Sequence, residues 1–136
     1  MNNRELLRIA EDARKYSHSP YSGFKVGAAL LVKSGKVYTG CNVECASLGG
    51  TNCAERTAIF KAISEGDKEI EAIAIASDNS EKNEATYPCG ICRQVIIEFG
   101  TEIKIVTGYS EGEIYECKIK DLIPNYFLGS DFRETL

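Results

Sequence analysis

Three segments of the chain carry apolar residues at helical spacing, and each has a clear start or stop signal. Asn2 followed by Glu5 resembles a capping box, which predicts a helix beginning directly after it. The other two segments start near a cysteine and end at a glycine. The expected helices span residues 3–17, 53–66 and 89–99.

Five short apolar segments have the length and the bounding turns of β-strands. They span residues 24–32, 36–43, 70–76, 102–107 and 114–119. Ser34-Gly35 makes a tight turn between the first two strands, which predicts an antiparallel hairpin. A helix separates 70–76 from 102–107, so these two strands should pair in parallel through a right-handed crossover. The link at 108–113 is too short for a helix, so the last strand should return antiparallel.

The predicted order is αββαβαββ, followed by a short helical or irregular tail from residue 121. This order predicts an α/β fold in three layers, with one mixed five-stranded sheet and helices on both faces. A chain of 136 residues with 43% hydrophobic and 26% charged residues fits a single domain over residues 1–136.

Charge and hydropathy exclude several classes of partner. The net charge is −4 and no basic block stands out, which argues against a nucleic-acid partner. The first residues lack the apolar run of a signal peptide. No segment approaches the roughly 20 apolar residues of a membrane span. We therefore expect a cytoplasmic protein with no membrane association.

Six cysteines in a chain of this size raise the possibility of a disulfide framework. The missing export signal argues against it, because the reducing cytosol keeps thiols free. We interpret Cys41, Cys45 and Cys117 as small, buried, partly apolar side chains.

The other three cysteines form a candidate metal site. Cys53, Cys89 and Cys92 each fall in the first turn of a predicted helix, so they offer three thiolates to one ion. Three protein ligands leave one open position on a tetrahedral zinc, as in catalytic sites. Glu55 follows two residues after the first ligand, where a carboxylate can move protons to and from a metal-bound water. The only histidine, His18, lies in a loop and is not expected to act as the base.

Five sequence blocks resemble the small, homotetrameric cytidine deaminases that act on free nucleosides. Zinc deaminases carry H-x-E followed by P-C-x-x-C, and a three-cysteine form also occurs. The matching blocks are P-Y-S-G-F-K-V-G-A-A-L (20–30), G-C-N-V-E (40–44), N-C-A-E-R-T-A (52–58), P-C-G-I-C-R-Q (88–94) and L-I-P (122–124).

The resemblance implies a cytidine deaminase-like fold and a zinc-dependent reaction of pyrimidine salvage. Cytidine and 2′-deoxycytidine would be hydrolysed to uridine and 2′-deoxyuridine with release of ammonia. One Zn²⁺ per subunit would be held by Cys53, Cys89 and Cys92, and zinc-bound hydroxide would attack C4. Glu55 would shuttle protons between the water, the ring nitrogen N3 and the leaving amine.

The resemblance also implies which residues of a subunit bind the nucleoside. Asn42 and Glu44 would hold the ribose hydroxyls, and Phe24 would pack on the base. The backbone of Ala54 would read the edge of the base.

In the homotetramer that the resemblance implies, adjacent subunits share their active sites. Ala46 and Phe127 would reach in from neighbouring subunits and help to close the site. This chain departs from the family pattern at Leu48, where the family usually has a tyrosine that contacts a neighbour's site. Ile91 stands where the family commonly has alanine.

Arg56 lies one residue after Glu55, beside the predicted thiolate cluster. Three thiolates make zinc electron-rich and weaken its effect on a bound water. Hydrogen bonds from the Arg56 guanidinium would offset that charge, so we interpret Arg56 as a residue that tunes the metal and does not touch substrate.

Two alternatives remain at this point. Relatives that deaminate another cytosine nucleoside, blasticidin S, also carry a glycine pair before the C-A-E block, like Gly49-Gly50 here. A non-catalytic zinc domain would close the metal site with a fourth cysteine, Cys45 or Cys41. Its metal would then have sulfur instead of water as the fourth ligand.

Overall fold

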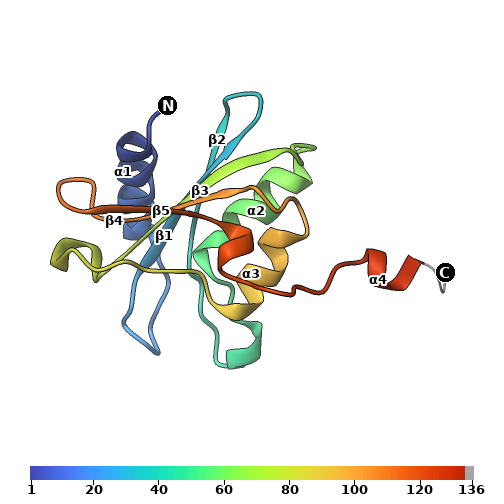
Figure 1. Cartoon of the computed structure of the whole chain (residues 1–136). Helices are drawn as coiled ribbons and strands as arrows, with labels where there is room; N and C mark the ends of the chain where they lie inside the picture. The colour runs from blue at the N-terminus through green and yellow to red at the C-terminus, as the bar shows by residue number, and fades with distance from the viewer. Residues whose placement is uncertain (134–136) are drawn as a thin grey trace.

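A mixed five-stranded sheet forms the centre of the computed structural model, which describes residues 1–133 (Figure 1). The strands are β1 (Val26–Val32), β2 (Val37–Cys41), β3 (Ile70–Ser77), β4 (Lys104–Gly108) and β5 (Ile114–Lys118). Their order across the sheet is β2-β1-β3-β4-β5. β3 and β4 pair in parallel, whereas β1–β2, β1–β3 and β4–β5 pair antiparallel. The predicted hairpin, parallel pair and antiparallel return are all confirmed.

Helices cover both faces of the sheet, as predicted. α1 (Asn3–Ala13) lies on one face, and α2 (Ala54–Ser64) and α3 (Gly90–Ile97) lie on the other (Figure 1). The shorter helical segments are η1 (Arg14–Tyr16), η2 (Leu48–Gly50), η3 (Ser80–Lys82), η4 (Ile119–Asp121) and α4 (Ser130–Arg133). Within residues 1–133, no helix has both the length and the apolar character that crossing a bilayer requires.

The first helix begins where its capping box predicts but ends earlier than expected. Glu5 donates its backbone N–H to the side chain of Asn2, and the reciprocal contact is also present. The regular α-helix stops at Ala13 and tightens into η1, and not at residue 17 as predicted. The chain then leaves the helix because the backbone of His18 forms a bridge with Val43.

The two faces of the sheet carry side chains of different size. Small residues face α1, mostly alanines, and the other face presents larger aliphatic side chains to α2 and α3. Because successive strand residues point to opposite faces, this difference follows from the sequence I-E-A-I-A-I-A of β3. Ile73 and Ile75 lie fully buried under α2 and α3, while Ala72 and Ala74 let α1 lie close to the sheet.

Strand β2 lies in close contact with α2, the helix that carries Cys53 and Glu55 at its start. A Cβ atom on Gly40 would lie 2.4 Å from the carbonyl oxygen of Ala54. Thr57 and Lys61 of α2 donate side-chain hydrogen bonds to the backbone carbonyls of β2 at Cys41 and Thr39. The distance between β2 and the beginning of α2 therefore depends on a glycine at position 40.

We expect Gly40→Ala to destabilise the fold by about 3 kcal/mol, because the new methyl group would meet backbone atoms that cannot rotate away. Urea unfolding followed by circular dichroism measures the change. Gly49→Ala is the matched control, since a Cβ there meets no atom within 4 Å. Equal stability of the two variants would contradict the close packing of β2 on α2.

Candidate active site

The first turns of α2 and α3 bring three cysteine sulfurs together. Cys53 and Cys89 occupy the N-cap positions of α2 and α3, and Cys92 lies in the first turn of α3. The three Sγ atoms lie within 4.8 Å of one another, and those of Cys53 and Cys89 are 3.6 Å apart. The parallel pairing of β3 with β4 contributes to this arrangement, because α3 is the crossover helix between these strands.

The geometry and chemistry of the three sulfurs fit a zinc ion. A tetrahedral zinc with Zn–S bonds of 2.3 Å holds its sulfur ligands about 3.8 Å apart, close to the separation of Cys53 and Cys89. Cys53 and Cys89 also line an open cavity, where a fourth ligand could enter. Cys53, Cys89 and Cys92 are therefore a three-thiolate site of the catalytic kind.

Arg56 contacts two of the three sulfurs. Its Nε donates to Cys92 Sγ at 3.4 Å, and its Nη2 donates to Cys53 Sγ at 3.2 Å. The guanidinium therefore bridges two candidate metal ligands from the side of α2. Arg56 is not among the residues that line the neighbouring cavity.

The thiols of Cys53 and Cys92 titrate as a pair. A hydrogen bond from Cys92 lowers the pKa of Cys53 to about 5, with a further contribution from Arg56. The pKa of Cys92 rises in turn, first because of the same contact with Cys53 and then because of burial. The site therefore stabilises at least one thiolate before any cation binds.

Glu55 lies in the first turn of α2 beside the sulfur cluster. Its side chain is only 4% exposed, and this burial raises the pKa of its carboxyl to about 7. The negative charge of Cys53 raises it further. Glu55 nevertheless reaches the wall of the cavity, so it is a buried acid–base group with access to a bound molecule.

A cavity of about 310 Å³ opens beside Cys53, Cys89 and Glu55. It brings together most of the residues predicted to bind substrate. Its remaining lining residues are Ser22, Phe24, Val26, Asn42, Glu44, Thr51, Ala54, Thr86 and Tyr87.

The side chain of Asn42 is buried and ties the strand β1 to the loop before it. Its Oδ1 accepts hydrogen bonds from the backbone N–H of Val26 (2.9 Å) and from the hydroxyl of Ser17 (2.5 Å). One hydrogen of its Nδ2 goes to the carbonyl oxygen of Phe24 at 2.8 Å. Within residues 1–133 the second Nδ2 hydrogen has no protein partner, and the side chain lines the cavity.

Glu44 is held in place by the loop that precedes Phe24. Its Oε1 accepts the backbone N–H groups of Tyr21 (3.0 Å) and Ser22 (3.1 Å), and its Oε2 accepts the Ser22 hydroxyl. These hydrogen bonds, with the Ser22 hydroxyl first, keep the pKa of Glu44 below its ordinary value. The carboxylate is therefore ionised at neutral pH, and one acceptor position on Oε2 remains for a ligand.

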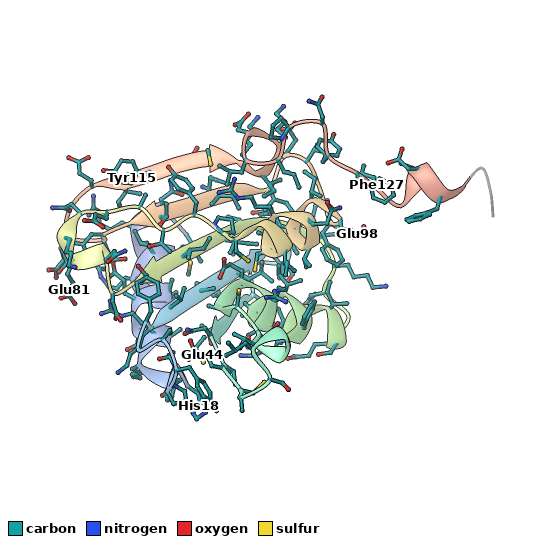
Figure 2. The ribbon with its side chains drawn as sticks, turned by 90° about the horizontal axis from the view of Figure 1, so that it is seen from below. His18, Glu44, Glu81, Glu98, Tyr115 and Phe127 are labelled. Atoms are coloured by element: carbon teal, nitrogen blue, oxygen red, sulfur yellow. The ribbon has the colours of Figure 1, made fainter. Side chains whose placement is uncertain are left out.

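Two of the predicted substrate-binding residues do not line the cavity of their own chain. Ala46 is exposed after β2, and Phe127 is 52% exposed on the C-terminal arm, where it packs edge-to-face against Phe132. Figure 2 shows Phe127 well apart from Glu44. This placement agrees with residues that would serve a neighbouring subunit, and their role stays a prediction. Leu48 is likewise exposed, at 67%.

Sequence reasoning missed several lining residues. Ser22 lies in the first matching block, and Thr86 and Tyr87 lie directly before Pro88 and Cys89. Their position next to a predicted ligand was a usable signal, because chain neighbours of a metal ligand must lie near the metal. The polar composition of residues 77–87 concealed it.

The remaining cysteines are free thiols outside the sulfur cluster. Cys41 and Cys117 are partly buried, but Cys45 is exposed, so the expected burial of Cys45 is wrong. Cys45 lies in an exposed loop, where its Sγ donates to the carbonyl oxygen of Ser47. Because neither Cys41 nor Cys45 joins the cluster in the described chain, the geometry does not support a zinc site closed by a fourth sulfur.

Comparison with known proteins agrees with this site. The family model for the cytidine and deoxycytidylate deaminase zinc-binding region matches residues 1–108. A cytidine deaminase of Halalkalibacterium halodurans is 44% identical over 98% of this chain and 100% of its own length. A probable cytidine deaminase of Dictyostelium discoideum is 42% identical over 96% of this chain and 89% of its own.

A solved structure is also similar. The crystal structure of cytidine deaminase from Burkholderia pseudomallei superposes with a TM-score of 0.87 at 43% sequence identity. The match covers 93% of this chain and 100% of that chain. The fold, the three-cysteine site and the sequence matches lead to one conclusion: the chain belongs to the cytidine and deoxycytidylate deaminase family.

Proposed function

We propose that this protein catalyses the hydrolytic deamination of cytidine and 2′-deoxycytidine to uridine and 2′-deoxyuridine, with release of ammonia. The observation that carries the proposal is a buried carboxyl, Glu55, beside a three-thiol cluster at a cavity of about 310 Å³. Full-length relatives named cytidine deaminase support it.

The chemistry divides between the metal site and Glu55. Zinc held by Cys53, Cys89 and Cys92 would lower the pKa of a water molecule and so supply hydroxide at neutral pH. Burial raises the pKa of the Glu55 carboxyl above its ordinary value, so this group can hold a proton as well as release one. It accepts one proton of the water and delivers it to N3 of the pyrimidine, where that proton stays. It then takes the proton of the new hydroxyl on C4 and passes it to the amine on C4, so that the carbonyl forms as the C–N bond breaks. That amine leaves as ammonia, and the base becomes uracil.

The apolar part of the cavity holds the base. Phe24 is half-buried and lines the cavity, so its ring can pack on a pyrimidine. Ala54 precedes Glu55 and also lines the cavity, so its backbone can read the edge of the base close to the acid–base group. Val26 adds a further apolar contact.

The free hydrogen-bonding groups of Asn42 and Glu44 match a single sugar hydroxyl. Asn42 has one unused donor and Glu44 has one unused acceptor position. A hydroxyl group can accept from the first and donate to the second at the same time. We assign this hydroxyl to the 3′ position, which cytidine and 2′-deoxycytidine share. A 2′-hydroxyl then finds no further partner on these two side chains.

The charge of the cavity favours a nucleoside over a nucleotide. Among the described residues that line it there is no lysine, arginine or histidine, and Glu44 and Glu55 are acidic. A 5′-phosphate would find no cation there and would be repelled by Glu44. The cavity therefore suits free cytidine better than its 5′-phosphate.

Replacing Glu55 tests both the reaction and the role of this residue. We expect the ultraviolet band of cytidine to shift when zinc-loaded wild type is added, and Glu55→Gln to lower kcat at least about 100-fold. Gln has the size of Glu but cannot shuttle a proton. Glu55→Ala runs alongside, and the zinc content of each variant is the control.

A folded, zinc-loaded wild type without activity on cytidine would refute the proposed substrate. Activity on blasticidin S alone would favour that alternative. A Glu55→Gln variant that keeps kcat within tenfold, with one zinc per chain, would remove the proton-shuttle role.

The sugar contacts predict how the protein ranks nucleosides. We expect kcat/KM for cytidine and 2′-deoxycytidine to agree within about threefold. For 2′,3′-dideoxycytidine it should fall by about 10–100-fold, because a hydrogen bond to a charged group is lost. Glu44→Gln should reduce the difference in kcat/KM between 2′-deoxycytidine and 2′,3′-dideoxycytidine. A tenfold preference for cytidine over 2′-deoxycytidine would instead show that the 2′-hydroxyl has a partner of its own.

Arg56 is proposed to tune the metal through its contacts with Cys53 and Cys92. We expect Arg56→Gln to lower kcat about tenfold or more and to change KM less than threefold, since Arg56 does not line the cavity. Arg56→Lys controls for the positive charge without the two-pronged contact. Unchanged turnover in Arg56→Gln would end this hypothesis.

We further propose a homotetramer with shared active sites, working in the cytoplasm. Ala46 is exposed, and Phe127 is exposed on the projecting C-terminal arm (Figure 2); both observations support a contribution to a neighbour's site. Six free thiols, three of them in the metal cluster, support a reducing compartment.

A further inference from the structure

Residues 85–88 form one wall of the active-site cavity, which we call the cavity wall. Thr86 and Tyr87 line the cavity, and Pro88 leads directly into Cys89. The wall ends the long connection from β3 to α3, which runs across the molecule after η3 (Figure 1). Its position therefore sets both the width of the cavity and the approach of Cys89 to the other sulfurs.

The cavity wall has little support from its own backbone. Within residues 1–133, no backbone-to-backbone hydrogen bond involves residues 85–88. Three side chains hold it instead. The backbone N–H of Thr86 donates to Thr107 Oγ1 at 2.8 Å, and the hydroxyls of Thr86 and Ser77 lie 2.6 Å apart. Arg93 Nε donates to the carbonyl oxygen of Pro88 at 2.7 Å.

Two of these supports come from the ends of neighbouring parallel strands. Ser77 is the last residue of β3, and Thr107 is the last but one of β4. Parallel pairing places their carboxyl ends at the same edge of the sheet, where open α/β sheets bind their ligands. Both side chains are fully buried, so no solvent competes for their hydroxyls. Ser77 Oγ also accepts the N–H of Asn79 at 3.0 Å, at the other end of the connection.

We propose that Thr107 is a positioning residue for the nucleoside, acting with Ser77 through Thr86, and this inference rests on the proposed function. Thr107 touches neither the cavity nor the sulfur cluster. Its hydroxyl, which accepts the Thr86 N–H, sets the distance between the cavity wall and the edge of the sheet. Loss of that hydroxyl leaves the Thr86 N–H without its partner, and the wall moves away from the bound nucleoside.

The test compares Thr107→Val, which keeps the side-chain shape but removes the hydroxyl, with Thr107→Ser, which keeps the hydroxyl. We expect Thr107→Val to raise KM for cytidine about tenfold, with kcat changed less than threefold and one zinc retained per chain. Thr107→Ser should restore KM to within about threefold of wild type. Amide hydrogen exchange at Thr86 should be at least about tenfold faster in Thr107→Val.

Ser110→Ala is the matched control. Ser110 is also buried beyond the end of β4, but its hydroxyl contacts Glu11 of α1 on the opposite side of the sheet. Ser110→Ala should unfold at a lower urea concentration than wild type, but its KM for cytidine should not change.

An unchanged KM in Thr107→Val, or a KM rise of equal size in Ser110→Ala, would overturn the inference. The exchange rate of the Thr86 amide is independent of the reaction. Suppose that wild type does not act on cytidine. Unaltered exchange of the Thr86 amide in Thr107→Val then still refutes the inference. Faster exchange supports the contact between Thr107 and the cavity wall, and shows that the proposed substrate is wrong.

Discussion

Three thiolates carry like charge and must nevertheless lie within bonding distance of one ion. Metal binding offsets this repulsion, but the fold must first bring the beginnings of two helices together. Close contact between β2 and α2 at Gly40 sets the position of Cys53. The crossover between β3 and β4 sets the position of Cys89 and Cys92. Arg56 then supplies positive charge to two of the sulfurs, and it is not among the residues that line the cavity.

The two carboxyl groups of the cavity have different pKa values because their surroundings differ. Glu55 is buried beside an anionic cluster, so the pKa of its carboxyl is raised into the neutral range. Glu44 accepts three hydrogen bonds from the loop that ends at Ser22, so its pKa is lowered and it stays charged. One carboxyl is thus suited to proton transfer and the other to holding a hydroxyl. Neither difference requires a special residue, because environment alone distinguishes the two glutamates.

The sequence predicted the fold and the metal ligands because both depend on local patterns. Hydrophobic spacing placed the five strands and three main helices, and the short link at 108–113 fixed the direction of the last strand. The thiol cluster was predictable because Cys53 and Cys89 each start a helix. The predictions were wrong where contacts between distant parts of the chain determine the structure. The early end of α1 depends on pairing between His18 and Val43, and the exposure of Cys45 depends on which elements cover its loop.

The contacts of Thr86 show the same limit. Ser77, Thr86 and Thr107 are common residues with no recognisable motif, and they meet only because two parallel strands end at one edge. The spacing of hydrophobic residues along the chain does not show that a hydroxyl on one strand holds a distant loop. The contacts that hold the cavity wall could therefore be found only in the three-dimensional structure.

The hydrogen bonds from Thr57 and Lys61 to β2 have a further effect at the border of the sheet. β2 is an outermost strand, and such strands can template association with an extended segment of another molecule. Here the carbonyl groups of Thr39 and Cys41 are already occupied by side chains from α2. The helix that carries Cys53 and Glu55 thus also protects its own sheet from edge-to-edge aggregation.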